Sequence, residues 1–169
     1  AFASVFHALY RAGGVNRIGS LRTIQVVRNG EKVADVDVYK YIMEGKLADD
    51  IHLSEGDVIL VSPYENLVGI SGKVKRPMIY EMKQGESLAT LINYAGGFTG
   101  DAYRNTVRLL RRSGREKQIY NVDKVDYENF ILTDDDEVSV EAVLDRFSNK
   151  VEVRGAVYRA GMYQLDSLT

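Results

Sequence analysis

The apolar and polar positions of residues 67–95 follow two different periods. Residues 67–74 alternate apolar with small or polar side chains, which is the period of a β-strand. Lys75–Arg76–Pro77 predicts a turn, because proline fixes its own φ and disfavours helix in the residue before it, so residues 78–80 are expected to return as a second strand. Apolar residues at 88, 91, 92 and 95 have helical spacing and predict a helix with one buried face.

The predicted helix has recognisable start and stop signals. Ser87 precedes it and is a good N-cap, while Gly96 and Gly97 follow it and are expected to form a left-handed C-terminal stop. Further strands are predicted over 106–110, 118–122 and 137–140. A hairpin, a helix and then more strands predict an α+β fold in which the helix lies across one face of a small mixed sheet, the β-grasp (ubiquitin-like) arrangement.

The same pattern occurs twice along the chain. Ala12–Gly13–Gly14 recurs as Ala95–Gly96–Gly97, 83 residues later, and residues 23–28 recur at 106–111 with the same spacing. Residues 53–57 match 132–136 at a spacing of 79, so the second copy is shorter, and the difference falls near residues 39–50. Three matches in one order indicate a tandem repeat.

A third element extends the repeat. The hairpin of residues 68–80 is similar to residues 151–163, so that Gly72 corresponds to Gly155 and Tyr80 to Tyr163. Because unpaired strands recruit partners, the last hairpin is expected to complete a unit in a neighbouring molecule. The predicted division has three parts: a unit lacking its first hairpin (1–66), a complete unit (67–143) and the opening hairpin of a third (144–169).

Composition narrows the function classes. Hydrophobic residues make up 45% of the 169 residues and charged residues 27%, which is usual for a globular protein with a core. The net charge of -2, with basic residues scattered among acids, gives no reason to expect a nucleic-acid partner. Without cysteine the chain has no disulfides, thiolate chemistry or cysteine-bound metals. No triad spacing or paired carboxylates stand out, so no catalytic site is expected.

Arg108, Arg111 and Arg112 are the first candidates for ligand binding. With Arg115 and Lys117 they gather about a predicted strand bend. Guanidinium groups suit an anionic partner such as an acidic polysaccharide or a neighbouring subunit. The alternative, which we favour, is a charged strand edge that prevents sheet-to-sheet pairing.

Tyr80 and Tyr163 are the second candidates. A tyrosine ring can stack on a sugar and adds a hydroxyl, but equivalent places in two hairpins favour a core or hairpin role first. His7 and His52 lack spaced ligand partners, so neither predicts a metal site. The run of acids at 134–137 could bind a cation, although a solvated turn is the favoured interpretation.

The glycines are interpreted structurally. Gly13 and Gly14, like the second Gly–Gly pair, follow predicted helices and do not lead into them, so they are caps and not phosphate-binding loops. Gly72 and Gly155 are assigned to the hairpins. No cofactor and no metal are expected.

At these residues the sequence resembles a known family. The segments VGISGKVKRPMIYEMKQGESLATLINYAGGFTGDAYRNTVRLLRR and ILTDDDEVSV look like the soluble-ligand-binding β-grasp (SLBB) repeat, and LSEGDVILV is the closest match to its closing motif. Three positions depart from the family pattern: Met78 stands where a glycine follows Pro77, Ala160–Gly161 replaces Pro–Gly, and Asp135 replaces the closing glycine.

The resemblance implies a function. Tandem SLBB copies are most typical of outer-membrane polysaccharide export proteins, which stack them into a periplasmic ring. It therefore implies a non-catalytic ligand-binding and scaffold module, in the periplasm at the outer membrane, with polysaccharide and further copies of itself as partners. The alternative is a soluble ligand-binding module of another system, such as DNA uptake or small-molecule binding. The helix-hairpin-helix, flavin and iron–sulfur motifs of other SLBB settings are absent from this sequence.

Overall fold

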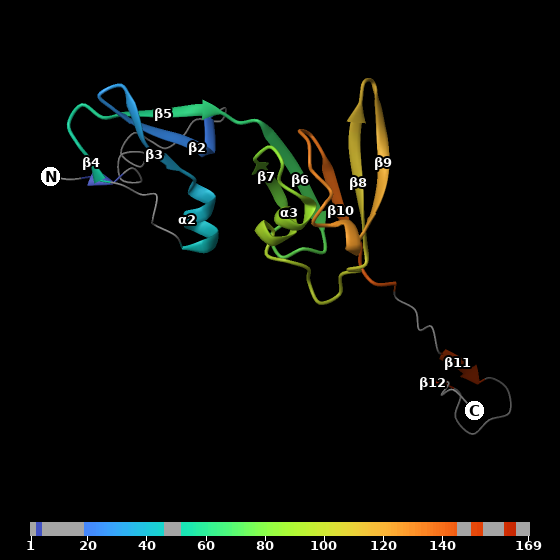
Figure 1. Ribbon diagram of the computed structural model, residues 1–169. Helices are drawn as coiled ribbons and strands as arrows, with labels where there is room; N and C mark the ends of the chain where they lie inside the picture. Colours follow the sequence, from blue (N-terminus) through green and yellow to red (C-terminus); the bar gives the residue numbers. More distant parts are fainter. Residues whose placement is uncertain (1–2, 5–18, 46–51, 145–149, 154–160, 165–169) are drawn as a thin grey trace.

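The computed structural model describes residues 3–4, 19–45, 52–144, 150–153 and 161–164 (Figure 1). Two groups of elements carry the structure, and we call them the N-terminal unit and the central unit. Neither described α-helix combines the length and the apolar character that crossing a bilayer requires.

The central unit contains a five-stranded sheet with one α-helix. Its strands lie in the order β7-β6-β10-β8-β9, with β10 parallel to β6 and antiparallel to β8. These elements confirm the strands and the helix predicted for this region, and the predicted α+β class. Their bounds are β6 Asn66–Gly72, β7 Met78–Met82, α3 Leu88–Tyr94, β8 Thr106–Ser113, β9 Glu116–Asp123, the 3-10 helix η1 Lys124–Asp126 and β10 Glu137–Val140. We keep β-grasp as our interpretation of this order.

Helix α3 begins and ends at the predicted residues. The Ser87 hydroxyl accepts a hydrogen bond from the Thr90 amide at 3.4 Å. After the helix, Gly96 and Gly97 have φ of 82° and 84°, and the Gly97 amide donates to the Ile92 carbonyl at 2.9 Å. Glycine adopts this left-handed geometry without the steric cost that a Cβ brings.

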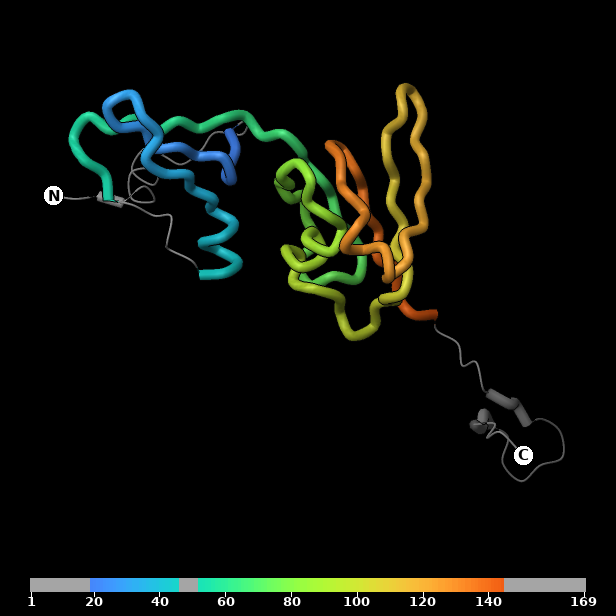
Figure 2. Tube along the Cα trace, in the orientation of Figure 1, coloured from blue at the N-terminus to red at the C-terminus, as the bar shows by residue number. Residues whose placement is uncertain are grey.

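The inward side chains of the central sheet and α3 form the main core. Its fully buried members include Tyr80, Leu88, Leu91, Leu109 and Val138. Alternation along β8 produces this pattern, since Val107 and Leu109 are buried while Arg108 between them is exposed. Figure 2 shows the β8–β9 hairpin projecting beyond the other strands of the sheet.

The N-terminal unit contains a three-stranded antiparallel sheet in the order β3-β2-β5. Ile24, Val26 and Val36 are its buried core. A helix, α2, follows β3 and occupies part of the region in which the two copies differ in length, whereas the central unit has only the short η1 at that place. The bounds are β2 Gly19–Arg28, β3 Glu31–Val36, α2 Val38–Glu44 and β5 Val58–Pro63.

Two short strand pairs complete the described residues. β1 (Ala3–Ser4) pairs with β4 (His52–Leu53), and β11 (Lys150–Val153) pairs with β12 (Gly161–Gln164), both antiparallel. The predicted first helix with His7, the cap at Gly13 and Gly14, and Gly155 lie outside the described residues.

Candidate functional site

An arginine and an aspartate join β8 to the turn before β10 in the central unit. Arg111 on β8 donates from Nε and Nη2 to the two carboxylate oxygens of Asp136, at 3.0 Å and 2.8 Å. The same carboxylate accepts from the Thr133 amide at 2.8 Å and is fully buried. The hydrogen bond to Asp136 raises the pKa of Arg111, although burial opposes the shift. The prediction of a solvated acidic turn is therefore wrong at Asp136, because its buried carboxylate accepts hydrogen bonds from Arg111 and from the turn's own backbone.

The N-terminal unit repeats this pair at the equivalent residues. Arg28 donates from Nε and Nη2 to Asp57 at 2.9 Å and 2.8 Å, and the Ser54 amide donates to Asp57 at 2.8 Å. The hydrogen bonds from Arg28 and Ser54 lower the pKa of Asp57 to about 2. In both units two guanidinium nitrogens donate to the two oxygens of one carboxylate. These arginines therefore stabilise the fold and are not available to a ligand.

Arg22 is the hub between the two units. This β2 side chain is 4% exposed, yet its guanidinium reaches carboxylates of both units: Asp37 at 3.2 Å and Glu86, to which it donates twice. It also donates to the Tyr94 hydroxyl at 2.9 Å and the Glu81 carbonyl at 3.2 Å. Burial alone would lower the pKa of Arg22, but the hydrogen bonds that it donates to Glu86 and Asp37 raise it, so its charge is retained in the interior.

Aromatic rings enclose the Arg22 guanidinium. Its Cζ lies 5.0 Å from the ring centre of Tyr39 and 5.1 Å from that of Tyr94. The two rings meet edge to face at 5.4 Å, and the Tyr39 hydroxyl accepts from the Glu81 amide at 2.8 Å. Burial raises the pKa of both tyrosines. Both rings belong to the main core, so α2 is packed onto the central unit through Tyr39.

Glu81 ties β2 to β7 on the other side of the hub. Its buried carboxylate accepts from the Ser20 hydroxyl at 2.5 Å and the Leu21 amide at 2.9 Å. Every described buried side-chain nitrogen and oxygen has a hydrogen-bond partner. A satisfied polar network of this kind specifies one arrangement of its members. The junction therefore fixes where β3 and α2 lie against Lys83 of the central unit.

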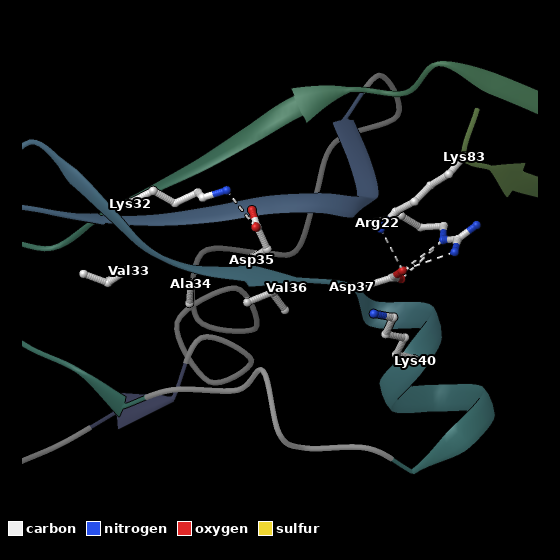
Figure 3. A pocket seen from close by; sticks show the side chains of 9 residues that line it. All are labelled: Arg22, Lys32, Val33, Ala34, Asp35, Val36, Asp37, Lys40 and Lys83. Atoms are coloured by element: carbon white, nitrogen blue, oxygen red, sulfur yellow. Dashed lines mark hydrogen bonds and ion pairs between the residues drawn. The ribbon is translucent and has the colours of Figure 1, made fainter. Parts of the chain in front are cut away.

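A groove with a basic lining opens beside this junction (Figure 3). Its volume is about 390 Å³, and its walls come from β3, the start of α2 and the loop after β7. Four of its nine lining residues are cationic and two are acidic. The lining residues are Arg22, Lys32, Val33, Ala34, Asp35, Val36, Asp37, Lys40 and Lys83.

The lysines of the groove differ in their ion pairs and in their exposure to solvent. The Lys32 ammonium pairs with Asp35 at 2.8 Å, but both side chains are more than half exposed, and such pairs are weak. Lys83 pairs with the buried Asp37 at 3.2 Å and is 39% exposed. Lys40 on α2 is exposed and has no ion pair among the described residues. The groove can therefore offer ammonium groups to an anion, while Arg22 behind them is already neutralised.

The described residues of the groove do not form a cluster of metal ligands. Within the part of the chain that the structure describes, no three His, Cys, Asp or Glu side chains gather as metal ligands. A concave surface with several donors of one charge suits the recognition of an anionic group such as a sugar carboxylate.

Comparison with known proteins connects this geometry to a family. The model of the SLBB domain family matches residues 67–121, which lie within the central unit. Residues 67–121 of the central unit are therefore similar to the SLBB domain. Two curated relatives, each the polysialic acid transport protein KpsD of Escherichia coli, are 24% identical over 153 residues. The match covers 89% of this chain but only 26% of KpsD, so the chain spans about a quarter of the length of these relatives.

The arginine candidates of the central unit fall on two faces of its sheet. Arg108 and Arg112 are exposed on the face away from α3, with long ion pairs to Glu141 at 3.4 Å and Asp135 at 3.6 Å. Arg111 points to the opposite face, where Asp136 holds it. The sequence cluster is therefore not one patch in space, because successive strand residues alternate between faces.

The tyrosine and glycine candidates occupy different environments. Tyr80 is 1% exposed, and its hydroxyl donates to the Arg76 carbonyl at 2.6 Å, which closes the β6–β7 turn. Tyr163 lies on β12, and its side chain is outside the described residues. Gly72 has φ of 87°, and a Cβ there would lie 2.1 Å from the Val140 carbonyl oxygen, so its hydrogen is what permits contact with β10.

Sequence reasoning missed the residues of the groove. Lys40 lies within residues 39–50, where the two copies differ in length, so the repeat comparison left it without a counterpart. Arg22 carried a signal that could have been used. It shares one face of β2 with Ile24 and Val26, and a charge at an inward position requires buried partners.

Proposed function

We propose that this chain is a non-catalytic ligand-binding module of a polysaccharide export protein, and that the basic groove receives anionic groups of the glycan. The observation that carries the proposal is the lining of the groove, where Lys32, Lys40 and Lys83 surround a cavity beside a rigid junction. The similarity to the SLBB domain and to a polysialic acid transport protein supports the same substrate class, because polysialic acid carries a carboxylate on every sugar.

The rigidity of the junction supports binding over catalysis. The pairing of Arg22 with carboxylates from both units removes freedom from the groove wall before any ligand arrives, which reduces the entropy lost on binding. The ammonium groups at the rim have the opposite property, since they are long, hydrated and mobile. Such a rim suits transient contact with a moving acidic polymer better than tight retention of one small molecule.

A scaffold role belongs to the same proposal. Strand β5 forms one edge of the N-terminal sheet among the described elements, and an edge strand offers backbone groups to another chain. We propose that copies associate through such edges into a channel wall in the periplasm at the outer membrane. We also retain the division into 1–66, 67–143 and 144–169 as part of this proposal; the separate sheets of the two units support it.

Binding of acidic and neutral glycans by the native chain tests the proposed function. The chain is titrated calorimetrically with polysialic acid oligomers and with neutral glucan oligomers of the same length, at low and at moderate salt. We expect tighter binding of the acidic oligomers, with a preference that shrinks as salt screens the lysines. Equal affinity for both oligomers at low salt, or a preference that salt does not change, would refute an electrostatic role for the groove.

A further inference from the structure

The register of the two sheets reveals an equivalent groove in the central unit. Ile24 and Val107 are repeat equivalents; they pair with Val36 on β3 and Val122 on β9. Two residues further on, the equivalents Val26 and Leu109 pair with Ala34 and Tyr120. Strand β9 therefore corresponds to β3, and both are edge strands of their sheets among the described elements.

A second groove lies along β9 where the basic groove lies along β3. Its volume is about 280 Å³, near the lower end of ligand pockets at roughly 300 Å³. It is lined by Tyr120, Asn121, Val122, Asp126, Asn129 and Phe130. We call it the aromatic groove, since Tyr120 stands where the basic groove has Ala34.

The rings of the aromatic groove are held in place from behind. Tyr120 and Phe130 meet edge to face at 5.8 Å, and the Arg111 guanidinium lies 5.5 Å and 5.1 Å from their ring centres. Arg111 is itself fixed by Asp136. Both rings are only partly buried, so an apolar surface with a set orientation remains at the groove.

Three polar side chains of the aromatic groove have no described partner, whereas the Tyr120 hydroxyl donates to Gln118 at 2.8 Å. Asn121, Asp126 and Asn129 are exposed, and their side chains make no hydrogen bond or ion pair among the described residues. Two amides and a carboxylate supply both donors and acceptors. No lysine or arginine is among the lining residues, and the negative charge of Asp126 would repel the carboxylate of an acidic sugar.

We propose that the aromatic groove is a saccharide subsite that takes an uncharged sugar ring. The C–H face of the ring would lie on Tyr120 and Phe130, and its hydroxyls would bond to Asn121, Asp126 and Asn129. This inference deepens the proposed function and rests on it. Each unit then carries one edge groove, a basic one for anionic groups and an aromatic one for ring faces.

Residue-resolved titration of the full chain tests the subsite. Amide shifts are followed by NMR with added methyl glycosides of glucose, galactose and N-acetylglucosamine at millimolar concentrations. We expect at least one of them to shift amides within 120–130, independently of salt. The doubly substituted variant Asn121→Ala with Asn129→Ala should weaken this binding about fivefold or more, whereas Asn93→Ala, an exposed asparagine on α3, should leave it unchanged.

The outcomes separate the subsite from the proposed function. Loss of neutral-sugar shifts in the double asparagine variant supports the subsite, whatever the acidic oligomers do. If none of the three glycosides shifts 120–130, or if the double variant binds like Asn93→Ala, the subsite is refuted while lysine-dependent binding of acidic oligomers can still stand. Shifts within 120–130 that depend on protein concentration and not on sugar would refute it too, by assigning β9 to self-association.

Discussion

Arg111 and Asp136 join β8 to the turn before β10 through two parallel hydrogen bonds of 3.0 Å and 2.8 Å. Arg28 and Asp57 do the same in the N-terminal unit, at 2.9 Å and 2.8 Å. The two copies differ in loop length, yet both contain this arginine–aspartate pair with the same geometry. We call the pair the clasp. The clasp closes each unit and leaves ligand contact to side chains elsewhere, which explains why arginines that look available in the sequence are already engaged.

The Arg111–Asp136 pair should be strongly stabilising. In Asp136→Ala the guanidinium loses its partner, and the Thr133 amide loses its acceptor, so we expect the free energy of unfolding to fall by about 3 kcal/mol. Urea unfolding of the variant measures this. Asp134→Ala is the matched control, as its exposed carboxylate accepts one hydrogen bond, from the Leu67 amide. A loss in Asp136→Ala no larger than in the control would contradict the clasp.

The Arg28–Asp57 pair should make stability depend on acid pH. The folded-state pKa of Asp57 is about 2 and lies below the ordinary aspartate value of 3.8, so the contribution of Asp57 is present above pH 4 and is lost as pH falls from 4 to 2. The stability advantage of the native chain over Asp57→Asn should therefore shrink across this window. Thermal unfolding of both proteins between pH 2 and 6 measures it, and an advantage that stays constant would exclude this assignment.

The Arg22 hub should control how α2 is attached to the central unit. In Arg22→Ala the carboxylates of Asp37 and Glu86 lose their main partner, and removing one member of a buried pair typically costs about 3–5 kcal/mol. We expect the amides of α2 to exchange hydrogen faster, while those of α3 keep their protection. Arg22→Lys keeps the charge but loses the planar fork, so it should lie between the two. Equal acceleration in α2 and α3 would show a general loss of stability instead.

The two glycines of β6 allow a matched test of close packing. Gly72→Ala would place a Cβ 2.1 Å from the Val140 carbonyl oxygen at a φ of 87°, so we expect a loss of about 3 kcal/mol or more. A Cβ at Gly69 meets nothing within 4 Å, and Gly69→Ala should therefore change stability little. Chemical denaturation of both variants decides the matter, and equal losses would show that contact with β10 is not what requires Gly72.

The elements of the central unit could be predicted from its sequence because local signals agreed there. The helix spacing, the Ser87 cap and the Gly–Gly stop all point to α3, and all three are found. What could not be predicted depends on contacts between distant residues. Arg22 and Glu86 are 64 positions apart, and only the packing of two units brings them together. The groove was missed for the same reason, since Lys32, Lys40 and Lys83 come from three separate elements.

The alternation of side chains between the two faces of β8 explains why the arginine cluster of the sequence is divided in the structure. Arg108, Arg111 and Arg112 form one cluster in the sequence, but the strand period sends Arg111 to the helix side and leaves the other two on the open face. A strict period-two reading of β8 would have separated them in advance. The partner of Arg111 could not have been found that way, because an acidic run gives no sign of which carboxylate turns inward.

Affinity of the groove variants for polysialic acid oligomers is the decisive measurement. Lys32→Ala and Lys40→Ala each remove one ammonium group from the rim, worth about 1 kcal/mol or less, and together they should weaken binding roughly tenfold. Arg115→Ala removes one positive charge from the exposed β8–β9 turn and should leave the dissociation constant nearly unchanged. Calorimetric titration at low salt that finds the lysine variants weakened and the Arg115 variant unaffected supports the basic groove as the glycan site. Equal effects in all of them, or no effect in the lysine variants, would contradict it.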